Sequence, residues 1–402
     1  MSPRAETSRA DVLLYVQHLL GIGHIRRAAA LGRAFQRAGL KVVFVTGGLP
    51  VGGLGLADAP GGIEVVQLPP ARSRDDSFRV ILDETDRPID EAWKARRRDQ
   101  LLAVYRRHRP RVVLTELFPF GRRKMRFELE PLIETARAAN PPALIACSLR
   151  DIVNRPESSE KTAWMVDRFT RLYDLLYVHG DPRFFRLEDS FPESAAVARR
   201  LHYTGYVTDA DETVAAARQD SGCPDGPGEV IVSAGGGAVG GALLRCALAA
   251  RPLSPLAEAP WRLLAGPHMP EAEFRALIAQ APPGVTVEPA RRDFVALLTR
   301  ARLSISQAGY NTLMEVMAAG LPGVVVPFAG GRETEQTQRA QGLAGAGLIT
   351  VVDEETLAPA SLADGIARAL RQGGTGGKPP FRFDGAEETA RHLIAQLKRA
   401  AA

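Results

Sequence analysis

The sequence alternates short apolar segments rich in β-branched residues with segments of helical periodicity along nearly its whole length. Two series of apolar segments can be recognised. The first series comprises residues 12–17, 41–47, 63–68, 111–117, 143–148, 174–180 and 202–207. The second comprises residues 229–235, 261–266, 285–290, 303–309, 323–328 and 348–352. Continuous apolar strands that alternate with helices are typical of parallel sheets covered by helices on both faces. The pattern therefore predicts an α/β protein with two doubly wound, Rossmann-like domains.

The length of 402 residues is sufficient for two domains that each have their own core. Residues 208–229 interrupt the alternation with acidic residues, Gly and Pro, a composition typical of a linker. We therefore expect an N-terminal domain over residues 1–207, a linker over 208–228 and a C-terminal domain over 229–380. A last helix within residues 381–402 either caps the second domain or packs back on the first.

The formal net charge of +5 is unevenly distributed along the chain. Residues 1–210 contain 33 Lys and Arg against 26 Asp and Glu, a balance of +7, whereas residues 211–402 contain 18 against 20, a balance of −2. A basic first half indicates contact with phosphate, an anionic lipid surface or nucleic acid, or simply a solvated Arg-rich surface. Nucleic acid is the least favoured partner, because aromatic residues make up only 6% of the chain and do not alternate with the basic ones.

Cysteine usage and apolar run lengths indicate the compartment. The three cysteines have no CxxC spacing, so neither a zinc site nor a disulfide framework is indicated. The N-terminal segment lacks the apolar stretch of a signal peptide, and no run of about eighteen apolar residues occurs. The sequence thus predicts a cytoplasmic protein, for which membrane contact would be peripheral, at the inner face.

The first strand of the first series ends in a glycine-containing turn, "QHLLGIGHIRRAAAL". Gly21 and Gly23 lie in this turn, and His24 and Arg26 begin the helix that follows. Glycines allow a ligand to approach the backbone closely, and a helix N-terminus favours negative charge. A histidine at this position can accept a proton near neutral pH. The turn is equally compatible with an incidental surface histidine.

The first strand of the second series runs into "VIVSAGGGAVGGALL". The strand ends at Ser233, the glycines Gly235, Gly236 and Gly237 follow, and a second glycine pair lies at the predicted helix entry. So many glycines are unfavourable for chain entropy, but they suit a loop of backbone N–H groups around a diphosphate. The loop fits neither the Walker A pattern nor a nicotinamide-binding GxGxxG pattern.

A third strand end, in "SISQAGYNTLMEVMAAG", combines small polar groups with a carboxylate. Gln307 and Gly309 follow the strand, Asn311 and Thr312 open a helix, and Glu315 lies about one turn further on. Asn and Thr can cap the helix or face a phosphate, and a glutamate can accept hydrogen bonds from ribose hydroxyls.

After the strand at 323–328, a glycine-containing loop leads to Glu335 and Gln336 at the start of another helix. Their side chains can bind sugar hydroxyls, or they are ordinary first-turn residues favoured by the helix dipole.

Residues 304–347 closely resemble the C-terminal domain of the GT-B glycosyltransferases of family 28. The resemblance is carried by "GYNTLMEVMAAGLPGVVVPF" followed by "ETEQTQRA", and "SAGGGAVGG" and "GIGH" stand where the family has its two glycine-rich loops. It extends over both domains in order and is strong over the last third of the chain. The first loop is shorter than the GGTGGH of the family, and GxGHxxR also occurs in a nucleotide-sugar hydrolase of related fold.

The resemblance implies a GT-B fold and a role for each candidate residue. Glu315 would bind the ribose hydroxyls, Asn311 and Thr312 would line the diphosphate end, and Glu335 and Gln336 would hold the donor sugar. His24 matches the histidine of the first loop, a base or a group near the transferred sugar. The implied donor is a uridine diphosphate sugar. Independently of the resemblance, we expect no metal requirement and no other cofactor. The implied acceptor site lies in the interdomain cleft.

Two further strand ends carry charged residues. In "TELFPFGRRKMRFE", Glu116 ends a strand, and the turn after it contains the cations Arg122, Arg123, Lys124 and Arg126. They can hold a phosphate or carboxylate of the acceptor, which would be anionic or lipid-linked, or they form a solvated helix face. In "CSLRDI", Arg150 and Asp151 follow another strand. Glu116 and Asp151 are therefore additional candidates for the general base.

Two other functions share the expected fold. A nucleotide-sugar hydrolase or epimerase would release or rearrange the sugar without an acceptor, although "VHGDPRFF" differs from the epimerase pattern HGDT at Pro182. A catalytically silent protein would bind the nucleotide sugar without turnover. The sequence does not distinguish the base of the nucleotide, the sugar, the acceptor, the anomeric outcome or the oligomeric state.

Overall fold

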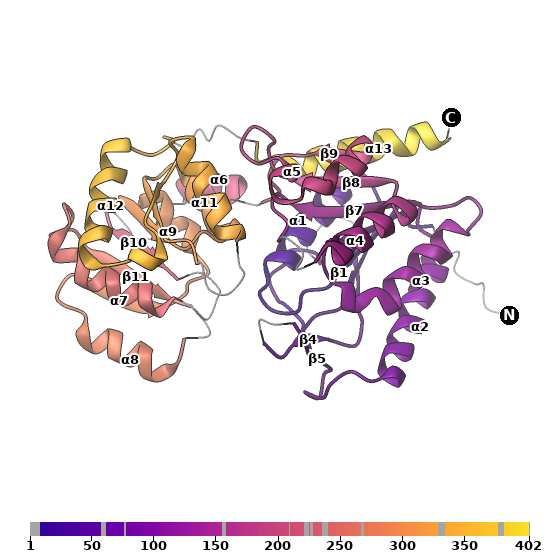
Figure 1. Cartoon of the computed structure of the whole chain (residues 1–402), viewed down its shortest axis with the longest axis horizontal. Helices are drawn as coiled ribbons and strands as arrows, with labels where there is room; N and C mark the ends of the chain where they lie inside the picture. The colour runs from indigo at the N-terminus through magenta and orange to yellow at the C-terminus, as the bar shows by residue number, and fades with distance from the viewer. Residues whose placement is uncertain are drawn as a thin grey trace. The chain divides into compact units, whose positions relative to one another are not determined.

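The computed structural model describes residues 9–57, 62–75, 78–154, 158–208, 210–220, 225, 228–234, 240–266, 269–328, 334–376 and 382–401, with the backbone alone at 211, 212 and 401. These residues form two compact units (Figure 1). The first unit comprises Met1–Pro182, Arg186–Val207 and Asp384–Ala402. The second comprises Arg183–Phe185 and Thr208–Phe383.

The first unit contains a 7-stranded sheet in which every pair of neighbouring strands is parallel. Its strand order is β3-β2-β1-β6-β7-β8-β9. The strands are β1 (Val12–Val16), β2 (Val42–Thr46), β3 (Glu64–Gln67), β6 (Val112–Glu116), β7 (Leu144–Arg150), β8 (Leu175–His179) and β9 (Leu201–Tyr203). A short antiparallel pair, β4 (Arg72–Ser73) and β5 (Ile81–Leu82), lies outside this sheet.

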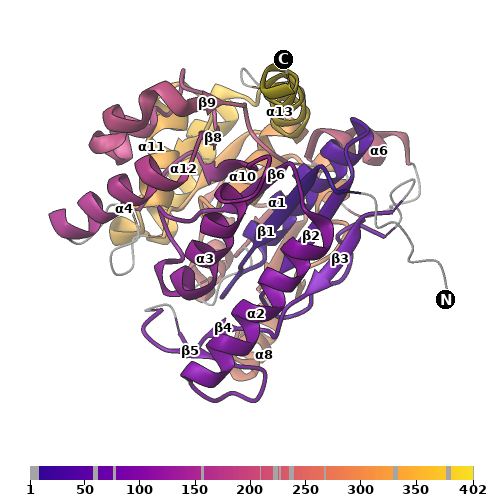
Figure 2. The same ribbon diagram turned by 90° about the vertical axis from the view of Figure 1, so that its right-hand side faces the viewer.

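Helices cover both faces of the first sheet. The helices are α1 (Gly23–Arg37), α2 (Glu91–His108), α3 (Arg126–Arg137), α4 (Ser159–Leu172), α5 (Leu187–Ser190) and α13 (Gly385–Ala401), with 3₁₀ turns η1 (Arg123–Met125) and η2 (Pro192–Arg200). Residues of α2, α3 and α4 share one core with the sheet, and α2 and α3 lie side by side (Figure 2). Residues of α1 and α13 share the core on the other face.

Helix α13 belongs to the first unit, although it follows the second unit in sequence. Ala386, Ala390, Leu393 and Leu397 of α13 are buried in the same core as α1. Polar contacts add to this packing: Tyr177 Oη lies 3.0 Å from His392 Nδ1, and His202 Nε2 lies 2.9 Å from Glu388 Oε1. Figure 1 shows α13 beside β8 and β9. Of the two placements expected for the last helix, the structure has it on the first unit.

The second unit contains a 6-stranded parallel sheet of order β12-β11-β10-β13-β14-β15. Its strands are β10 (Val230–Ser233), β11 (Trp261–Ala265), β12 (Val285–Pro289), β13 (Leu303–Ser306), β14 (Gly323–Val325) and β15 (Thr350–Val351). Its helices are α6 (Ala210–Gln219), α7 (Gly241–Ala250), α8 (Glu271–Gln280), α9 (Phe294–Arg300), α10 (Tyr310–Ala319), α11 (Glu335–Gly345) and α12 (Pro359–Gln372), with 3₁₀ turns η3 (Arg251–Leu253) and η4 (Glu354–Thr356). Residues of α7 and α12 pack into one core with this sheet, and α6, α9 and α10 contact one another.

The predicted fold class is confirmed. Each apolar segment predicted as a strand overlaps one strand of the two sheets, and both sheets are parallel. The β4–β5 pair was not predicted, and the segment expected to be a linker contains helix α6. Among the described parts of the chain, no helix combines the length and apolarity needed to cross a membrane.

Candidate functional site

Each sheet has one position where the strand order reverses, between β1 and β6 in the first unit and between β10 and β13 in the second. In doubly wound sheets, ligands bind beyond the carboxyl ends of the strands at such positions. His24 follows β1 and Glu116 ends β6. Ser233 ends β10, and Gln307 and Gly309 follow β13. The residues singled out in the sequence are therefore concentrated at both reversal points.

At the reversal point of the first unit, His24, Arg27 and Glu116 form a compact polar cluster. His24 Nδ1 lies 2.8 Å from Glu116 Oε1, and Arg27 Nη2 donates a hydrogen bond to the same oxygen. The Glu116 side chain is fully buried, whereas that of His24 is 18% exposed. Two of the three predicted general-base candidates, His24 and Glu116, are thus in direct contact.

The contact with Glu116 determines the tautomer of His24. An unprotonated Nδ1 and an ionised carboxylate would be two acceptors facing each other at 2.8 Å. We therefore assign the proton to Nδ1, which donates to Glu116 Oε1. In the neutral ring, Nε2 then carries the lone pair. His24 can accept a proton at Nε2 while Glu116 stabilises the charge that develops on the ring.

Burial and neighbouring charges set the protonation states of this pair. Burial lowers the pKa of His24 to about 4, and the attraction of Glu116 only partly offsets it. Burial alone would raise the pKa of Glu116, but His24, which is protonated at the low pH where Glu116 titrates, and Arg27 lower it to about 2. At neutral pH, His24 is therefore neutral and Glu116 is ionised.

The second carboxylate oxygen of Glu116 is buried and, among the residues that the structure describes, lacks a hydrogen-bond partner. A buried acceptor without a partner is unfavourable, and such groups are concentrated at functional sites. Asp151 is also buried, immediately after β7, and its Oδ1 accepts a hydrogen bond from the backbone N–H of Ile152 at 3.0 Å. Asp151 thus lies one strand further from β1 than Glu116.

The predicted acceptor-binding cations point in different directions. Arg122 donates to the carbonyl of Gln17 at 2.7 Å, and its pKa is lowered by burial and by nearby Arg150, although Glu116 opposes the shift. Arg123 lies over the ring of Trp164, 5.5 Å from its centroid. Arg122 is therefore close to both Glu116 and Arg150, whereas Arg123 turns toward α4.

The remaining predicted cations lie at the surface of the first unit. Lys124 donates to the carbonyl of Arg79, next to the β4–β5 pair. Arg26 and Arg126 are exposed, and the glycines Gly21 and Gly23 belong to the turn that precedes and opens α1.

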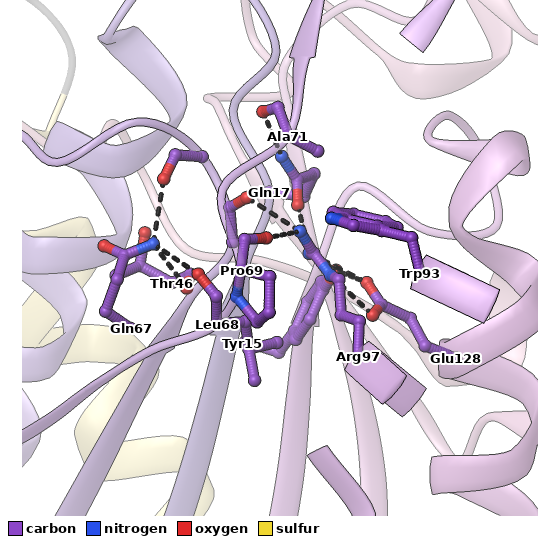
Figure 3. Close-up of polar contacts among 12 residues, drawn as sticks. Tyr15, Gln17, Thr46, Gln67, Leu68, Pro69, Ala71, Trp93, Arg97 and Glu128 are labelled. Atoms are coloured by element: carbon purple, nitrogen blue, oxygen red, sulfur yellow. Dashed lines mark hydrogen bonds and ion pairs between the residues drawn. The ribbon is translucent and has the colours of Figure 1, made fainter. Parts of the chain in front are cut away.

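A buried polar network supports the turn after β1 (Figure 3). Arg97 of α2 and Glu128 of α3 are fully buried and form an ion pair, with Arg97 Nε 2.7 Å from Glu128 Oε2. Arg97 also donates to Gln17 Oε1 and, at 2.9 Å, to the carbonyl of Gly47. Tyr15 donates to Glu128. The network therefore connects two helices to the ends of β1 and β2, where the His24 turn begins.

At the reversal point of the second unit, helix α10 begins directly after the strand β13. Gly309 is the N-cap residue of α10, and Asn311 and Thr312 lie in its first turn. Glycine offers no side chain to cap the helix, and a helix N-terminus without a side-chain cap favours an anion. Glu315 is part of the same helix and is partly exposed, and Gln307 and Ser233 are buried at the adjacent strand ends.

Glu335 and Gln336 occupy the first two positions of α11. Glu335 is buried, and its Oε1 accepts a hydrogen bond from Arg339 at 2.7 Å. The Oε1 atom of Gln336 accepts the backbone N–H of Phe328 at 3.2 Å. The amide nitrogen of Gln336 is a donor only, so it can bind a hydroxyl oxygen. Gly235, Gly236 and Gly237 lie outside the described residues.

Several contributors to these clusters were not predicted, among them Arg27, Arg97 and Arg339. Arg27 had a detectable signal, since it lies three residues after His24 and therefore on the same helix face. Arg339 likewise lies four residues after Glu335. Within the described residues, no group of three or more His, Cys, Asp or Glu side chains is arranged to hold a metal ion.

Comparison with known protein families identifies the domain type of the second unit. Residues 235–376 match the family described as the glycosyltransferase family 28 C-terminal domain. The second unit contains a family 28 domain. The matched range includes α10 and the start of α11, so every predicted donor-binding residue except Ser233 lies within it.

Curated relatives of the family 28 domain are UDP-N-acetylglucosamine--N-acetylmuramyl-(pentapeptide) pyrophosphoryl-undecaprenol N-acetylglucosamine transferases. The protein from Thermotoga neapolitana is 32% identical over 91 residues, 23% of this chain and 27% of that protein. The protein from an Exiguobacterium species is 36% identical over 104 residues, 25% of this chain and 29% of that protein. The similarity thus spans about a quarter of these relatives.

Similarity to solved structures extends over both units. The calicheamicin glycosyltransferase CalG4 has a TM-score of 0.58 at 17% identity, covering 98% of this chain and 100% of that one. Acinetobacter baumannii MurG has a TM-score of 0.56 at 18% identity, covering 96% of this chain and 99% of that one. The protein therefore has the GT-B fold, and its family 28 domain is the C-terminal half of that fold.

Proposed function

We propose that this protein is a glycosyltransferase that transfers a sugar from a nucleotide diphosphate, a uridine diphosphate sugar in the first instance, to a hydroxyl group of an acceptor. The observation that carries the proposal is the family 28 domain together with the local structure of α10. Within that domain, a glycine-capped helix begins at the strand-order reversal and carries Asn311, Thr312 and Glu315 in its first turns.

The second unit would bind the donor. The N–H groups at the start of α10 would face the diphosphate, with Asn311 and Thr312 beside them. Glu315 would accept hydrogen bonds from the ribose hydroxyls, and Glu335 and Gln336 would contact the sugar. The glycine-rich loop 235–237 would contribute further N–H groups.

The first unit would supply the base. The acceptor oxygen attacks the anomeric carbon of the sugar as the bond from that carbon to the diphosphate oxygen breaks. The proton of the acceptor hydroxyl passes to Nε2 of His24, Glu116 stabilises the resulting imidazolium, and the nucleoside diphosphate departs. Because helix N-termini can stabilise the leaving diphosphate, the proposal includes no metal and no other cofactor.

The acceptor is proposed by chemical class alone. Arg122, which lies near Glu116, and Arg150, which lies near Arg122, favour an acceptor that carries a phosphate or carboxylate. The curated relatives act on a pyrophosphoryl-undecaprenol compound, and a lipid-linked acceptor is part of the proposal for this chain. A cytoplasmic location with peripheral membrane contact stays a prediction.

The donor site can be tested by a thermal-shift panel with UDP, GDP, dTDP and CDP. We expect one nucleotide to raise the melting temperature of the wild-type protein, because a ligand of the folded state stabilises it by mass action. Glu315→Ala should lose this shift. Glu258→Ala is the control, because Glu258 is exposed and precedes β11, at the amino ends of the strands of the same sheet.

The outcomes of the panel separate the candidate functions. A shift in neither the wild-type protein nor the variants would contradict the proposal. With the nucleotide known, rapid release of free sugar from the nucleotide sugar without any acceptor would identify a hydrolase instead. Full activity after treatment with EDTA is expected for a metal-independent transferase.

A further inference from the structure

The first turn of α11 contains a buried ion pair that none of the predicted roles requires. Arg339 is fully buried, and its Nη2 donates to Glu335 Oε1 at 2.7 Å. The two residues are four positions apart, a spacing that places them on one helix face. Moving a guanidinium and a carboxylate out of water is unfavourable unless both are well paired. A buried pair at this position therefore needs an explanation beyond helix stability.

The exposed pair Glu271–Arg275 on α8 has the same spacing and a similar distance, 2.8 Å. Its side chains are 69% and 74% exposed. Such a pair contributes little to stability and constrains neither side chain strongly. The comparison shows that the i, i+4 spacing by itself does not lead to burial, so the surroundings of Arg339 are the distinguishing feature.

The residues that surround Arg339 lie at the start of α10 rather than on α11. Arg339 Nη1 donates to the carbonyl of Ala308 at 3.3 Å. The guanidinium also lies over the ring of Tyr310, 5.4 Å from its centroid. Ala308 and Tyr310 flank Gly309, the N-cap residue of α10. A single side chain thus contacts the residues on both sides of the α10 N-cap and the first residue of α11.

We propose that Arg339 is a positioning residue that orients Glu335 toward the donor sugar and couples it to the N-terminus of α10. The inference rests on the proposed function, in which α10 binds the diphosphate and Glu335 binds the sugar. A planar guanidinium can serve the carboxylate, the carbonyl and the aromatic ring together, whereas the ammonium of lysine cannot reproduce this fork geometry. The two ends of the donor would therefore be bound by one connected unit.

Arg339→Lys tests this role, because it retains the positive charge but loses the fork. Isothermal titration should compare the nucleoside diphosphate identified in the panel, UDP first, with its N-acetylglucosamine conjugate. We expect the variant to bind the conjugate about tenfold more weakly and UDP within about threefold of the wild type, since one charge-assisted hydrogen bond to the sugar is misplaced. Arg275→Lys is the control and should change neither affinity.

The possible results separate this inference from the proposed function. Wild-type protein that binds neither compound contradicts the proposed function itself. A wild type that binds both, with a variant that weakens both equally or neither, overturns the role of Arg339 alone.

If Arg339→Lys does not fold, the double variant Glu335→Gln with Arg339→Met leaves no buried charge. It should retain UDP binding but bind the conjugate about tenfold more weakly than the wild type. Unchanged binding of the conjugate by this variant would refute the proposal.

Discussion

At the scale of single residues, Glu116 determines what His24 can do. The carboxylate holds Nδ1 of the ring and leaves Nε2 as the basic atom, while Arg27 keeps the carboxylate charged. A histidine with a pKa of about 4 is entirely neutral at pH 7, but it is also a weak base. The proton would therefore leave the acceptor hydroxyl only as the bond to the diphosphate breaks, rather than in an earlier step.

The lowered pKa of His24 predicts a specific pH dependence of stability. The unfolded chain takes up a proton at the ordinary histidine pKa of about 6.5, whereas the folded protein does so only near the value of about 4. Wild-type stability should therefore decrease as the pH falls from 7.5 to 5. The linkage of His24 amounts to about 2 kcal/mol at pH 5. His24→Gln should therefore lose about that much less stability than the wild type, because His18, His179 and His392, whose pKa values burial also lowers, respond in both proteins.

Denaturant unfolding of both proteins at pH 7.5 and pH 5 measures the effect. The difference in unfolding free energy between the two proteins at pH 7.5, where His24 is neutral in both the folded and the unfolded chain, is the internal control. Glu116 does not interfere, because its own loss of stability begins only below its ordinary pKa, as the pH falls toward about 2. A stability difference that is the same at both pH values would contradict the assignment of a neutral, buried His24.

Single residues also show which parts of the site can be predicted from the sequence and which cannot. His24 was predicted from its position after a glycine turn, and Glu116 from its position at a strand end. Arg26 was chosen from this turn as an acceptor ligand, but Arg27 is the residue that contacts Glu116. The distinction depends on which helix face turns toward β6, and that is set by packing between elements distant in sequence.

At the scale of elements, the turn after β2 is packed so closely that two of its residues must be glycine. A Cβ atom on Gly47 would meet Arg97 and Gln17, and one on Gly48 would meet the ring of His18. Gly47 therefore permits the Arg97 network to approach the backbone, and Gly48 does the same for the ring of His18. Because Gln17 is part of this network, the turn after β2 and the turn that carries His24 are stabilised together.

Gly47→Ala tests this coupling. We expect it to destabilise the protein by about 1–3 kcal/mol, because the new methyl group must displace a buried ion pair. Gly52→Ala is the control, since no atom lies within 4 Å of its added Cβ and its φ is not in the left-handed region. The control should change stability by less than about 1 kcal/mol. Equal effects measured by urea unfolding would show that the network tolerates the methyl group.

Elements differed in how well the sequence predicted them. The inner strands of both sheets are buried and therefore read as continuous apolar runs. The edge strands β3, β9 and β12 are partly exposed. The β4 and β5 strands have two residues each, too few for any periodicity. The sequence does not predict helix α6, because an acidic segment before Gly and Pro is also typical of a linker. In the structure, the backbone N–H of Ala210 bonds to Thr208 Oγ1 as in a helix start.

At the scale of the whole molecule, the first unit is assembled from segments far apart in the chain. Its core on the α1 face includes α13, and the bridge between Val207 and Asp384 joins the two points where the chain leaves and re-enters the unit. The second unit is thus an insertion between the last strand of the first sheet and the helix that covers it. The first unit depends on α13 for a complete core.

Leu393→Ala should destabilise the first unit selectively. Leu393 is fully buried against α1, and truncation of a buried leucine costs about 2–5 kcal/mol. Hydrogen exchange should therefore speed up in α1, β1 and β2, and remain unchanged in β10 and β13. Lys398→Ala, on the exposed side of the same helix, is the control and should alter neither unit. Faster exchange throughout both units would contradict the division.

The return of α13 also has a consequence for biosynthesis. A ribosome must translate residues 208–383 after the last strand of the first sheet before it supplies the helix that completes that sheet's covering. At roughly 5–20 residues per second, this interval lasts about 10 to 35 seconds. The apolar surface of α1 that α13 covers in the folded protein remains exposed during that time. All segments of the second unit, in contrast, have been synthesised before α13. We therefore expect the second unit to finish folding first, although it is made later.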